Sequence, residues 1–463
     1  MSKIRTAFDL ANERIIESNY KPIDFVDDRV DFGTGKDTEL PDFILDWKNP
    51  NKDINKNKEV EFVTWDSPVV KPKTPEDLGI KIQKSNTYHY EDNNIIDVFW
   101  HGPFEEYNST CRAARSIIFR LGSENVKTKL DIKQSRKDIN DATKKELEIF
   151  TKHEFSKNSI NIYHECLPQD ISENFVFNNN IAFSNICNSE LFSELFSEST
   201  SINTINTINT MTTITKLNKM REIWVTSNYG KNIMEKNGVK VPIYVIPYGV
   251  DQNRYSENSQ HSQHSQPFKI NIQTNKFIFL SIFKWEKIKN FSILLKSFMN
   301  EFNSNDDVSL LILTKHNSLE NLMKDFDNIR KTINKNDNDL PHIVLYDKII
   351  SEKDMPGLYS FSNAYVSLSA KNSSLTFLES SLIGKPIISG KWGVQTDFLT
   401  EDNSFLIKNT QDILEQIQKT MRFVFENYEI AKEKNKKLQN VIKKYSWENT
   451  VKLILERLNQ NKE

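Results

Sequence analysis

The fold is decided by the stretch Lys371-Asn-Ser-Ser-Leu-Thr-Phe-Leu-Glu379-Ser-Ser-Leu-Ile-Gly-Lys-Pro386-Ile-Ile-Ser389. An apolar run at residues 364–369 precedes it and indicates a buried strand, and residues 386–390 indicate the next strand. Between them, residues 375–383 carry apolar side chains at helical spacing, and Gly384 follows where a helix would end. The order strand, polar loop, helix, glycine, strand predicts one βαβ unit.

The polar loop of this unit, residues 372–374, directly precedes the predicted helix. Backbone N–H groups at a helix N-terminus lack partners inside the helix, so such a loop attracts anions, and phosphate above all. Glu379 lies one turn into the same helix. Its carboxylate fits two roles, an acceptor for ribose hydroxyls or a carboxylate stabilised by the helix dipole, and the pattern leaves both open.

The size and charge of the chain limit the possible classes of protein. At 463 residues the chain exceeds the size of one hydrophobic core, so we expect two or more domains. The formal net charge of -2 provides no overall basic field, so we expect no nucleic-acid partner. The three cysteines, Cys111, Cys166 and Cys187, are far apart and imply neither a disulfide framework nor a zinc site.

Apolar segments of the kind that direct secretion or span membranes are not seen. The first residues lead into no apolar signal region. The longest apolar runs, such as residues 277–283, have the length of a strand and are far too short to cross a bilayer. We therefore expect no transmembrane segment and a cytoplasmic location.

Strand and helix patterns alternate through most of the chain. A strand at residues 95–103 runs into a glycine turn, and a helix is expected from Ser109 as its N-cap to a stop at Gly122. Before this unit, only residues 60–65 give a weak strand pattern. Further strands are expected at residues 159–164, 181–184, 222–227, 241–247, 277–283, 308–314 and 342–346. Further helices are expected at residues 228–237, 290–299, 319–333, 352–360 and within 412–458.

This alternation predicts an α/β protein with two Rossmann-like, doubly wound parallel-sheet domains that face a cleft. Two repetitive polar inserts, Ile-Asn-Thr repeats up to Thr210 and the Ser-Gln-His repeat at residues 259–266, are interpreted as surface loops. We divide the chain into a poorly readable extension at 1–90, a first domain at 91–250, a linker with a low-complexity insert at 251–275, a second domain at 276–440 and a final helix at 441–463.

Few residues have the position and chemistry of a binding site. Lys284 and Lys289 follow the first strand of the second domain and precede a helix, an arrangement that suits a diphosphate but equally fits a solvated loop. His101 with Gly102, and His164, lie at the ends of strands, where ligands of such sheets bind. The histidines fit a general base, an acceptor contact or a purely structural role.

Two residue pairs have the spacing of metal ligands, but both lie in segments whose composition produces such spacings without a metal. His261 and His264 belong to the polar repeat, and Asp337 with Asp339 has the spacing of a DxD motif inside an Asn- and Asp-rich loop. We therefore expect no bound metal.

Four stretches together resemble retaining glycosyltransferases of the GT-B fold, family 4, also called group 1. They are residues 279–290, residues 223–228 with 245–251, residues 371–386, and residues 392–398, and they occur in the family's order. The resemblance covers roughly residues 95–460. It implies that the final helix returns to the first domain and that neither a cofactor nor a metal is needed.

The resemblance also implies roles for individual residues. Lys284 and Lys289 match the basic pair that binds the diphosphate of a nucleotide sugar and assists catalysis. Ser374, Leu375 and Thr376 match the backbone segment that faces phosphate and sugar. Glu379 matches the family's second glutamate, which contacts the ribose.

On the acceptor side, His101 and Gly102 are candidate contacts, and His164 is a further candidate catalytic residue. One departure concerns Lys371, which stands where the family has its first glutamate, followed by Asn372 in place of the usual glycine. The expected function is transfer of a sugar, with retention, from a nucleotide sugar to a glycan, protein or lipid acceptor. The alternatives are an inactive GT-B-like binding or scaffold protein and another two-domain ligand binder.

Overall fold

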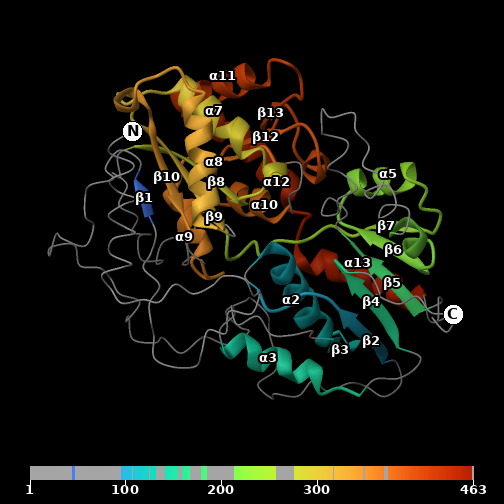
Figure 1. Ribbon diagram of the computed structural model, residues 1–463. Helices are drawn as coiled ribbons and strands as arrows, with labels where there is room; N and C mark the ends of the chain where they lie inside the picture. The colour runs from blue at the N-terminus through green and yellow to red at the C-terminus, as the bar shows by residue number, and fades with distance from the viewer. Residues whose placement is uncertain are drawn as a thin grey trace.

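Two separate β-sheets, each with helices packed around it, form the computed structural model of the chain (Figure 1). The strand order is β3-β2-β4-β5-β6-β7 in the first sheet and β1-β10-β9-β8-β11-β12-β13 in the second. The predicted α/β fold with two parallel sheets is therefore confirmed. The structure describes residues 44–46, 95–106, 108–124, 126–131, 141–154, 159–166, 179–184, 213–256, 276–315, 318–347, 350–369 and 374–460.

All strands of the first sheet run parallel. They are β2 (Ile96–His101), β3 (Val126–Asp131), β4 (Ile160–His164), β5 (Asn180–Phe183), β6 (Glu222–Val225) and β7 (Ile243–Val245). Its helices are α2 (Ser109–Gly122), α3 (Asp141–Thr151) and α5 (Asn228–Lys236). The N-cap of α2 is Asn108 and not Ser109 as predicted, because the Asn108 side chain accepts a hydrogen bond from the Cys111 amide at 2.9 Å.

Both faces of this sheet are buried, as in a doubly wound fold. On β6, Trp224 packs into the same apolar cluster as α2, whereas Ile223 and Val225 point to the opposite face and join a second cluster. Side chains that alternate along a strand thus serve two cores. This explains why β5 and β6 are buried at every position.

The second sheet is parallel except at one edge, where β1 (Ile44–Asp46) runs antiparallel to β10. The remaining strands are β8 (Phe277–Lys284), β9 (Val308–Lys315), β10 (His342–Tyr346), β11 (Ala364–Ser367), β12 (Ile387–Gly390) and β13 (Phe405–Ile407). Its helices are α7 (Phe291–Glu301), α8 (Leu319–Lys331), α9 (Met355–Phe361), α10 (Leu375–Leu382), α11 (Ile413–Glu426) and α12 (Tyr428–Ile442). Short 3-10 turns are η5 (Lys287–Lys289), η6 (Asp337–Asp339) and η7 (Val394–Asp397).

The βαβ unit predicted from residues 364–390 is present as β11, α10 and β12. The two strands are parallel neighbours, with Tyr365 opposite Ile387. Gly384 follows the helix with a φ of 82°, a left-handed conformation that glycine adopts without strain. Phe377 and Leu378 of the helix are fully buried.

Several elements were not predicted from the sequence, among them β1, β3, α3 and β13. The weak strand pattern at 60–65, the Ile-Asn-Thr repeat and the Ser-Gln-His repeat lie outside the described residues. The same holds for Cys187 and for Lys371.

The two segments that carry the chain between the domains pair with each other. Val250 forms an isolated parallel bridge with Ser446, and its amide donates to the Tyr445 carbonyl at 3.0 Å. Beyond this point, α13 (Trp447–Gln460) lies on the first domain although it follows the second in sequence (Figure 1). Trp447 and Ile454 join the apolar cluster beneath α2.

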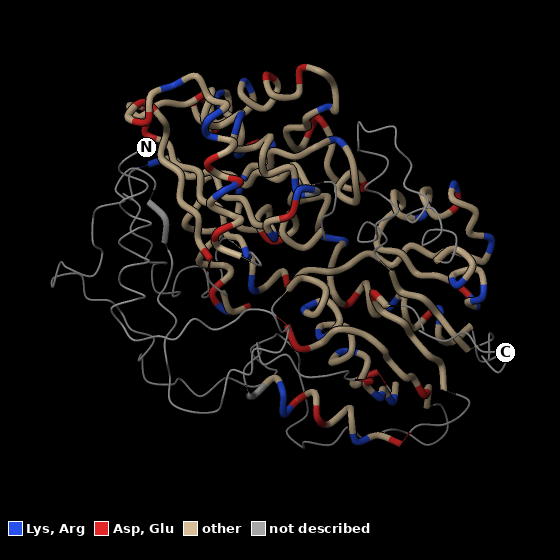
Figure 2. The backbone as a smooth tube through the Cα atoms, in the orientation of Figure 1, with Lys and Arg blue, Asp and Glu red and all other residues tan. Residues whose placement is uncertain are grey.

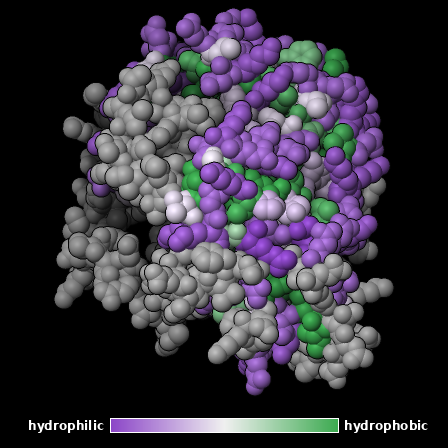
Figure 3. Space-filling view, turned by 90° about the vertical axis from the view of Figure 1, so that its right-hand side faces the viewer, coloured by the Kyte–Doolittle hydropathy of each residue, from purple (hydrophilic) through white to green (hydrophobic). Residues whose placement is uncertain are grey.

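Basic and acidic residues are interspersed along the described chain. Positions of Lys and Arg alternate with those of Asp and Glu along the described parts of both domains (Figure 2). The face at the right of Figure 1 carries mainly hydrophilic side chains, with apolar residues showing between them near its middle (Figure 3). In the part of the chain that the structure describes, no helix is both long and apolar enough to cross a bilayer.

Close packing of the two connecting segments makes Gly249 sensitive to substitution. A Cβ atom at Gly249 would lie 2.3 Å from the Trp447 amide nitrogen and 2.4 Å from the Ser446 carbonyl carbon. Because both neighbours are backbone, we expect Gly249→Ala to lower the free energy of unfolding by about 3 kcal/mol, measured by urea unfolding. Gly230→Ala is the control, since its Cβ would meet nothing nearer than the Ser227 hydroxyl at 3.3 Å. Equal effects of the two substitutions would contradict this account.

Candidate functional site

The sheet of the second domain places two predicted donor segments at one edge. Strands β8 and β11 are parallel neighbours, so their carboxyl ends lie side by side. Asn290, in the left-handed conformation with a φ of 55°, donates from its side chain to the Leu368 carbonyl at 2.8 Å. This bond ties the segment from Lys284 to Lys289 to the end of β11, from which the chain leads to α10.

The two lysines of this segment differ in their surroundings. Lys284 is 51% exposed and pairs with Glu286 at 2.9 Å. Lys289 is half-buried at the end of η5. An exposed ion pair such as that of Lys284 contributes little free energy, so a diphosphate with more charge would compete for it effectively.

Residues 374–376 form the first turn of α10. Ser374 is buried and makes no side-chain cap, and Thr376 is half-buried. Leu375 is buried among the apolar side chains of the first domain. The N-terminus of α10 is therefore held at the junction of the two domains.

Glu379 is bonded across this junction. Its side chain is 1% exposed, and one carboxylate oxygen accepts a hydrogen bond from Arg112 of α2, in the other domain. The second oxygen accepts from the Tyr359 hydroxyl at 2.9 Å. Contact with a ribose is not tested by this geometry and stays a prediction.

A second ion pair lies next to the first. Arg115, one turn beyond Arg112 on α2, donates to Glu352, which lies just before α9. Arg115 also donates to the Glu106 carbonyl at 2.8 Å, and Arg254 lies 3.9 Å from the Glu352 carboxylate. Burial alone would raise the pKa of the Glu352 carboxyl, but Arg115 and then Arg112 outweigh burial and hold that pKa below its ordinary value.

These residues were missed by the sequence analysis. The signal was available, since Arg112 and Arg115 lie three residues apart on a helix in which most of the other residues, such as Ala114 and Ile118, are apolar. Charged residues on an apolar helix face need buried partners. A small cavity of about 30 Å³, lined by Arg112 and Glu379 among others, remains within the cluster.

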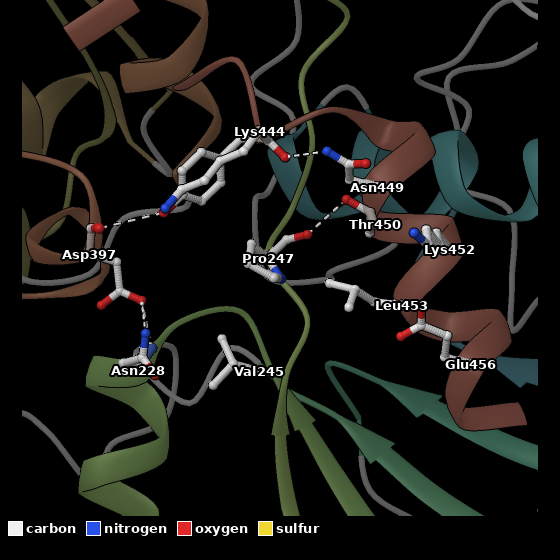
Figure 4. A pocket seen from close by; sticks show the side chains of 11 residues that line it. Asn228, Val245, Pro247, Asp397, Lys444, Asn449, Thr450, Lys452, Leu453 and Glu456 are labelled. Atoms are coloured by element: carbon white, nitrogen blue, oxygen red, sulfur yellow. Dashed lines mark hydrogen bonds between the residues drawn. The ribbon is translucent and has the colours of Figure 1, made fainter. Parts of the chain in front are cut away.

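Another polar contact joins the domains on the other side of the connecting segments. Asp397 of η7 accepts hydrogen bonds from the amides of Asn228 at 2.6 Å and Tyr229 at 3.4 Å, at the N-terminus of α5. The helix dipole favours a carboxylate at this position. A cavity of about 430 Å³ lies beside it, bounded by the connecting segment at Pro247 and by α13 (Figure 4). None of the predicted donor residues lines this cavity.

His101 is held by its own sheet. Its Nδ1 lies 2.9 Å from Asp131 and its Nε2 lies 3.2 Å from the side-chain oxygen of Asn161. The ring stacks on Tyr163, with centroids 4.5 Å apart. Both ring nitrogens are thus engaged within the first domain, and an acceptor contact stays a prediction.

His164 is fully buried at the end of β4. Its Nε2 lies 2.7 Å from the Tyr248 hydroxyl, and its ring stacks on Phe183. Gly102 packs against it so closely that a Cβ would lie 3.0 Å from the His164 carbonyl oxygen. These contacts give Gly102 and His164 a structural role in joining two strands, and the predicted roles in acceptor binding and catalysis stay untested.

The DxD spacing at Asp337 and Asp339 is explained by local contacts. Asp337 pairs with Arg330, and Asp339 accepts from the Asn336 side chain at 3.2 Å. Among the described residues, no group of three or more His, Cys, Asp or Glu side chains is arranged to hold a metal ion.

Comparisons with solved structures identify the fold. Anabaena HepE in complex with UDP and glucose matches with a TM-score of 0.56 at 12% identity, over 79% of this chain and 100% of that one. Sucrose-phosphate synthase from Thermosynechococcus elongatus matches with a TM-score of 0.57 at 11% identity, over 79% and 98%. A glycosyltransferase from Rickettsia africae matches with a TM-score of 0.53 at 14% identity, over 80% and 99%.

Sequence comparisons give no further assignment. No family model matches the chain, and no curated protein matches it. The similarity is therefore one of structure, and the chain has the two-domain α/β fold called GT-B.

The ion pair of Glu352 generates a prediction about stability and pH. Glu352→Gln would leave Arg115 without a counter-charge in a largely buried place, so we expect a loss of roughly 3 kcal/mol at pH 7 in urea unfolding. Because the pKa of Glu352 is lowered by folding, its contribution is present above the ordinary carboxyl pKa of about 4.3 and is lost as the pH falls through the lower folded-state value. The difference between wild type and variant should shrink in that acidic range.

The matched control is Glu401→Gln. Glu401 is 55% exposed and pairs with Lys391 at 3.2 Å, so its substitution should cost well under about 1 kcal/mol. Similar losses for the two variants would show that the Glu352 pair has no special energetic role.

His164 generates a second prediction about pH. Burial lowers the pKa of His164 to about 3, whereas histidine in an unfolded chain titrates near 6.5. Between these values only the unfolded chain binds the proton, so stability falls as the pH drops, by about 2 kcal/mol between pH 7 and pH 5. We expect His164→Gln to remove this part of the pH dependence in urea unfolding. The control is His153→Gln, which removes a half-buried histidine whose Nδ1 lies 2.7 Å from the Thr128 carbonyl oxygen and should leave this part of the pH dependence in place. An unchanged pH dependence in His164→Gln would refute the buried, neutral state.

Proposed function

We propose that this chain transfers a sugar from a nucleotide-sugar donor to a glycan, protein or lipid acceptor, with retention and without a metal. The observation that carries the proposal is the meeting, in a GT-B fold, of the basic segment Lys284–Lys289 with the end of β11 through Asn290. HepE, a protein of this fold, has been solved with UDP-glucose, which supports a nucleotide sugar as donor. Retention and membership of family 4 rest on the sequence resemblance.

In this proposal the donor-site residues act by electrostatic stabilisation. Cleavage of the bond to the sugar leaves negative charge on the departing diphosphate, and the ammonium groups of Lys284 and Lys289 would stabilise it. The amides of residues 374–376, at the N-terminus of α10, would hold the phosphates, and Glu379 would accept from the ribose hydroxyls. His164, His101 and Gly102 remain candidates on the acceptor side.

One set of contacts favours an alternative, a GT-B-like binding or scaffold protein without transferase activity. Glu379 is already bonded to Arg112 and Tyr359, and Lys284 to Glu286. In addition, Lys371 stands at the position where the family that this sequence resembles has its first glutamate. Release of sugar from nucleotide sugars would support the transferase, whereas nucleotide binding without turnover over a full panel of nucleotide sugars would support the alternative.

Donor binding is tested by calorimetry with the diphosphates of uridine, guanosine and adenosine. Because each lysine contact to a diphosphate is charge-assisted, we expect Lys284→Ala and Lys289→Ala each to weaken binding by about 1.5–3 kcal/mol. Lys419→Ala is the control, since Lys419 is an exposed lysine paired with Glu415 on α11. If both lysine variants fold and bind the nucleoside diphosphates as tightly as the wild type, Lys284 and Lys289 do not form the donor site.

A further inference from the structure

The two halves of the predicted donor site differ in their access to solvent. Lys284, at the end of β8, is exposed. At the start of α10, by contrast, Ser374 is buried and Leu375 lies in the apolar cluster of the first domain. Glu379, one turn further along α10, is buried and bonded to a side chain of that domain. The first domain therefore covers the α10 half of the site and leaves Lys284 accessible.

The observed placement of the domains leaves no room for a nucleoside beside Glu379. One carboxylate oxygen accepts from Arg112 of α2, and the other accepts from the Tyr359 hydroxyl at 2.9 Å. The cavity next to these residues has a volume of about 30 Å³, which is room for about two water molecules. A ribose can reach Glu379 only if Arg112 leaves and the two domains separate at this point.

Two ion pairs oppose that separation. Arg112 pairs with Glu379 and Arg115 pairs with Glu352, so that both pairs run from α2 of the first domain to the second. Arg112 also donates to the Tyr255 hydroxyl at 2.9 Å. An ion that stays buried after losing its partner is very costly, so a small displacement is unfavourable. The stable arrangements are the paired, closed one and an open one in which water reaches all of these ions.

We propose that the pairs Arg112–Glu379 and Arg115–Glu352 form an autoinhibitory latch. In the nucleotide-free protein Arg112 occupies the carboxylate that the ribose of the donor needs, and the donor binds to Glu379 only after the latch has opened. The inference rests on the proposed function, because it takes Glu379 as the acceptor for the ribose hydroxyls. Arg112 and the ribose thus compete for one carboxylate.

The latch reverses the expected effect of removing an arginine. Loss of an arginine beside a diphosphate site ordinarily weakens binding, because a charge-assisted contact is lost. With a latch, the apparent affinity is the intrinsic affinity multiplied by the fraction of molecules that are open. Arg112→Met leaves the Glu379 carboxylate buried without its ionic partner in the closed state, which raises the open fraction. The variant should therefore bind a nucleotide more tightly than the wild type does.

The experiment is calorimetry with the diphosphates of uridine, guanosine and adenosine and with their 2′,3′-dideoxy counterparts. A pH of about 8 keeps the released carboxylate ionised. We expect Arg112→Met to bind the preferred ribonucleotide about tenfold more tightly than the wild type. The dideoxy ligand lacks the hydroxyls that Glu379 would accept and gains little from opening, so its affinity should stay within about threefold.

A second variant, Glu352→Gln, breaks the other pair of the latch without touching Glu379. It keeps the shape of the side chain but removes the counter-charge of Arg115. We expect the same ribose-selective gain in affinity, smaller than that of Arg112→Met because the Arg112–Glu379 pair remains. This variant keeps the test decisive if Arg112→Met does not fold.

The control is Arg120→Met, which removes another arginine of α2. Arg120 pairs with Glu448 at 3.3 Å, and Glu448 belongs to α13, which packs against α2 on the first domain. This pair does not cross the junction, so its loss should leave both affinities unchanged.

X-ray scattering in solution gives an independent measure of opening. Saturation of the wild type with the preferred ribonucleotide should increase the radius of gyration, since the observed closed placement has no room for the ligand beside Glu379. A decrease or no change in the radius on saturation would overturn the latch.

The remaining outcomes separate the latch from the proposed function. If wild type binds a nucleoside diphosphate and the folded variants Arg112→Met and Glu352→Gln bind it equally or more weakly, the latch is wrong and the proposed function stands. An equal gain for the ribonucleotide and the dideoxy ligand would likewise overturn the latch, because it would reflect a general change in charge. If wild type and both variants bind none of the nucleoside diphosphates, the proposed function is refuted and the latch with it.

Discussion

The arrangement of the two domains depends on charges buried between them. Arg112 and Arg115 project from α2 of the first domain. Arg112 pairs with Glu379 and Arg115 with Glu352, both of the second domain. Removing such groups from water costs several kcal/mol for each ion, and only close hydrogen-bonded pairing offsets that cost. The pairs therefore contribute little net stability but select one relative placement of the domains, because any sliding would leave a charge without its partner.

Other contacts at the junction also fix the placement of the two domains relative to each other. Asp397 meets the N-terminus of α5 on the other side of the connecting segments, and Val250 pairs with Ser446 between them. Apolar contacts also join the domains. Leu375 of the second domain and Trp447, which follows that domain in sequence, both lie in the apolar core of the first domain. Contacts this numerous and this varied resist hinge motion more strongly than the two connecting segments would alone.

Elements with strong apolar periodicity could be predicted from the sequence, and those without it could not. The unit β11–α10–β12 was predicted closely because Gly384 and the flanking apolar runs mark its limits. Strand β3 was missed because only Val126 and Leu130 are apolar among its residues, and the buried position between them is the polar Thr128. The partners of Glu379 lie 267 and 20 residues away in sequence, and no local pattern relates them.

Helix α10 has two tasks that the βαβ geometry joins. A crossover between parallel strands must direct its N-terminus toward the carboxyl edge of the sheet, where an anion would bind. The same edge faces the first domain, so the first turn also inserts Leu375 into that domain, and the second turn offers Glu379 to Arg112. A change that shifts the helix affects both its N-terminus and its contacts with the first domain, because Leu375 and Glu379 belong to the same helix. Under the proposed function, recognition of a nucleotide and packing of the domains therefore cannot vary independently in this chain.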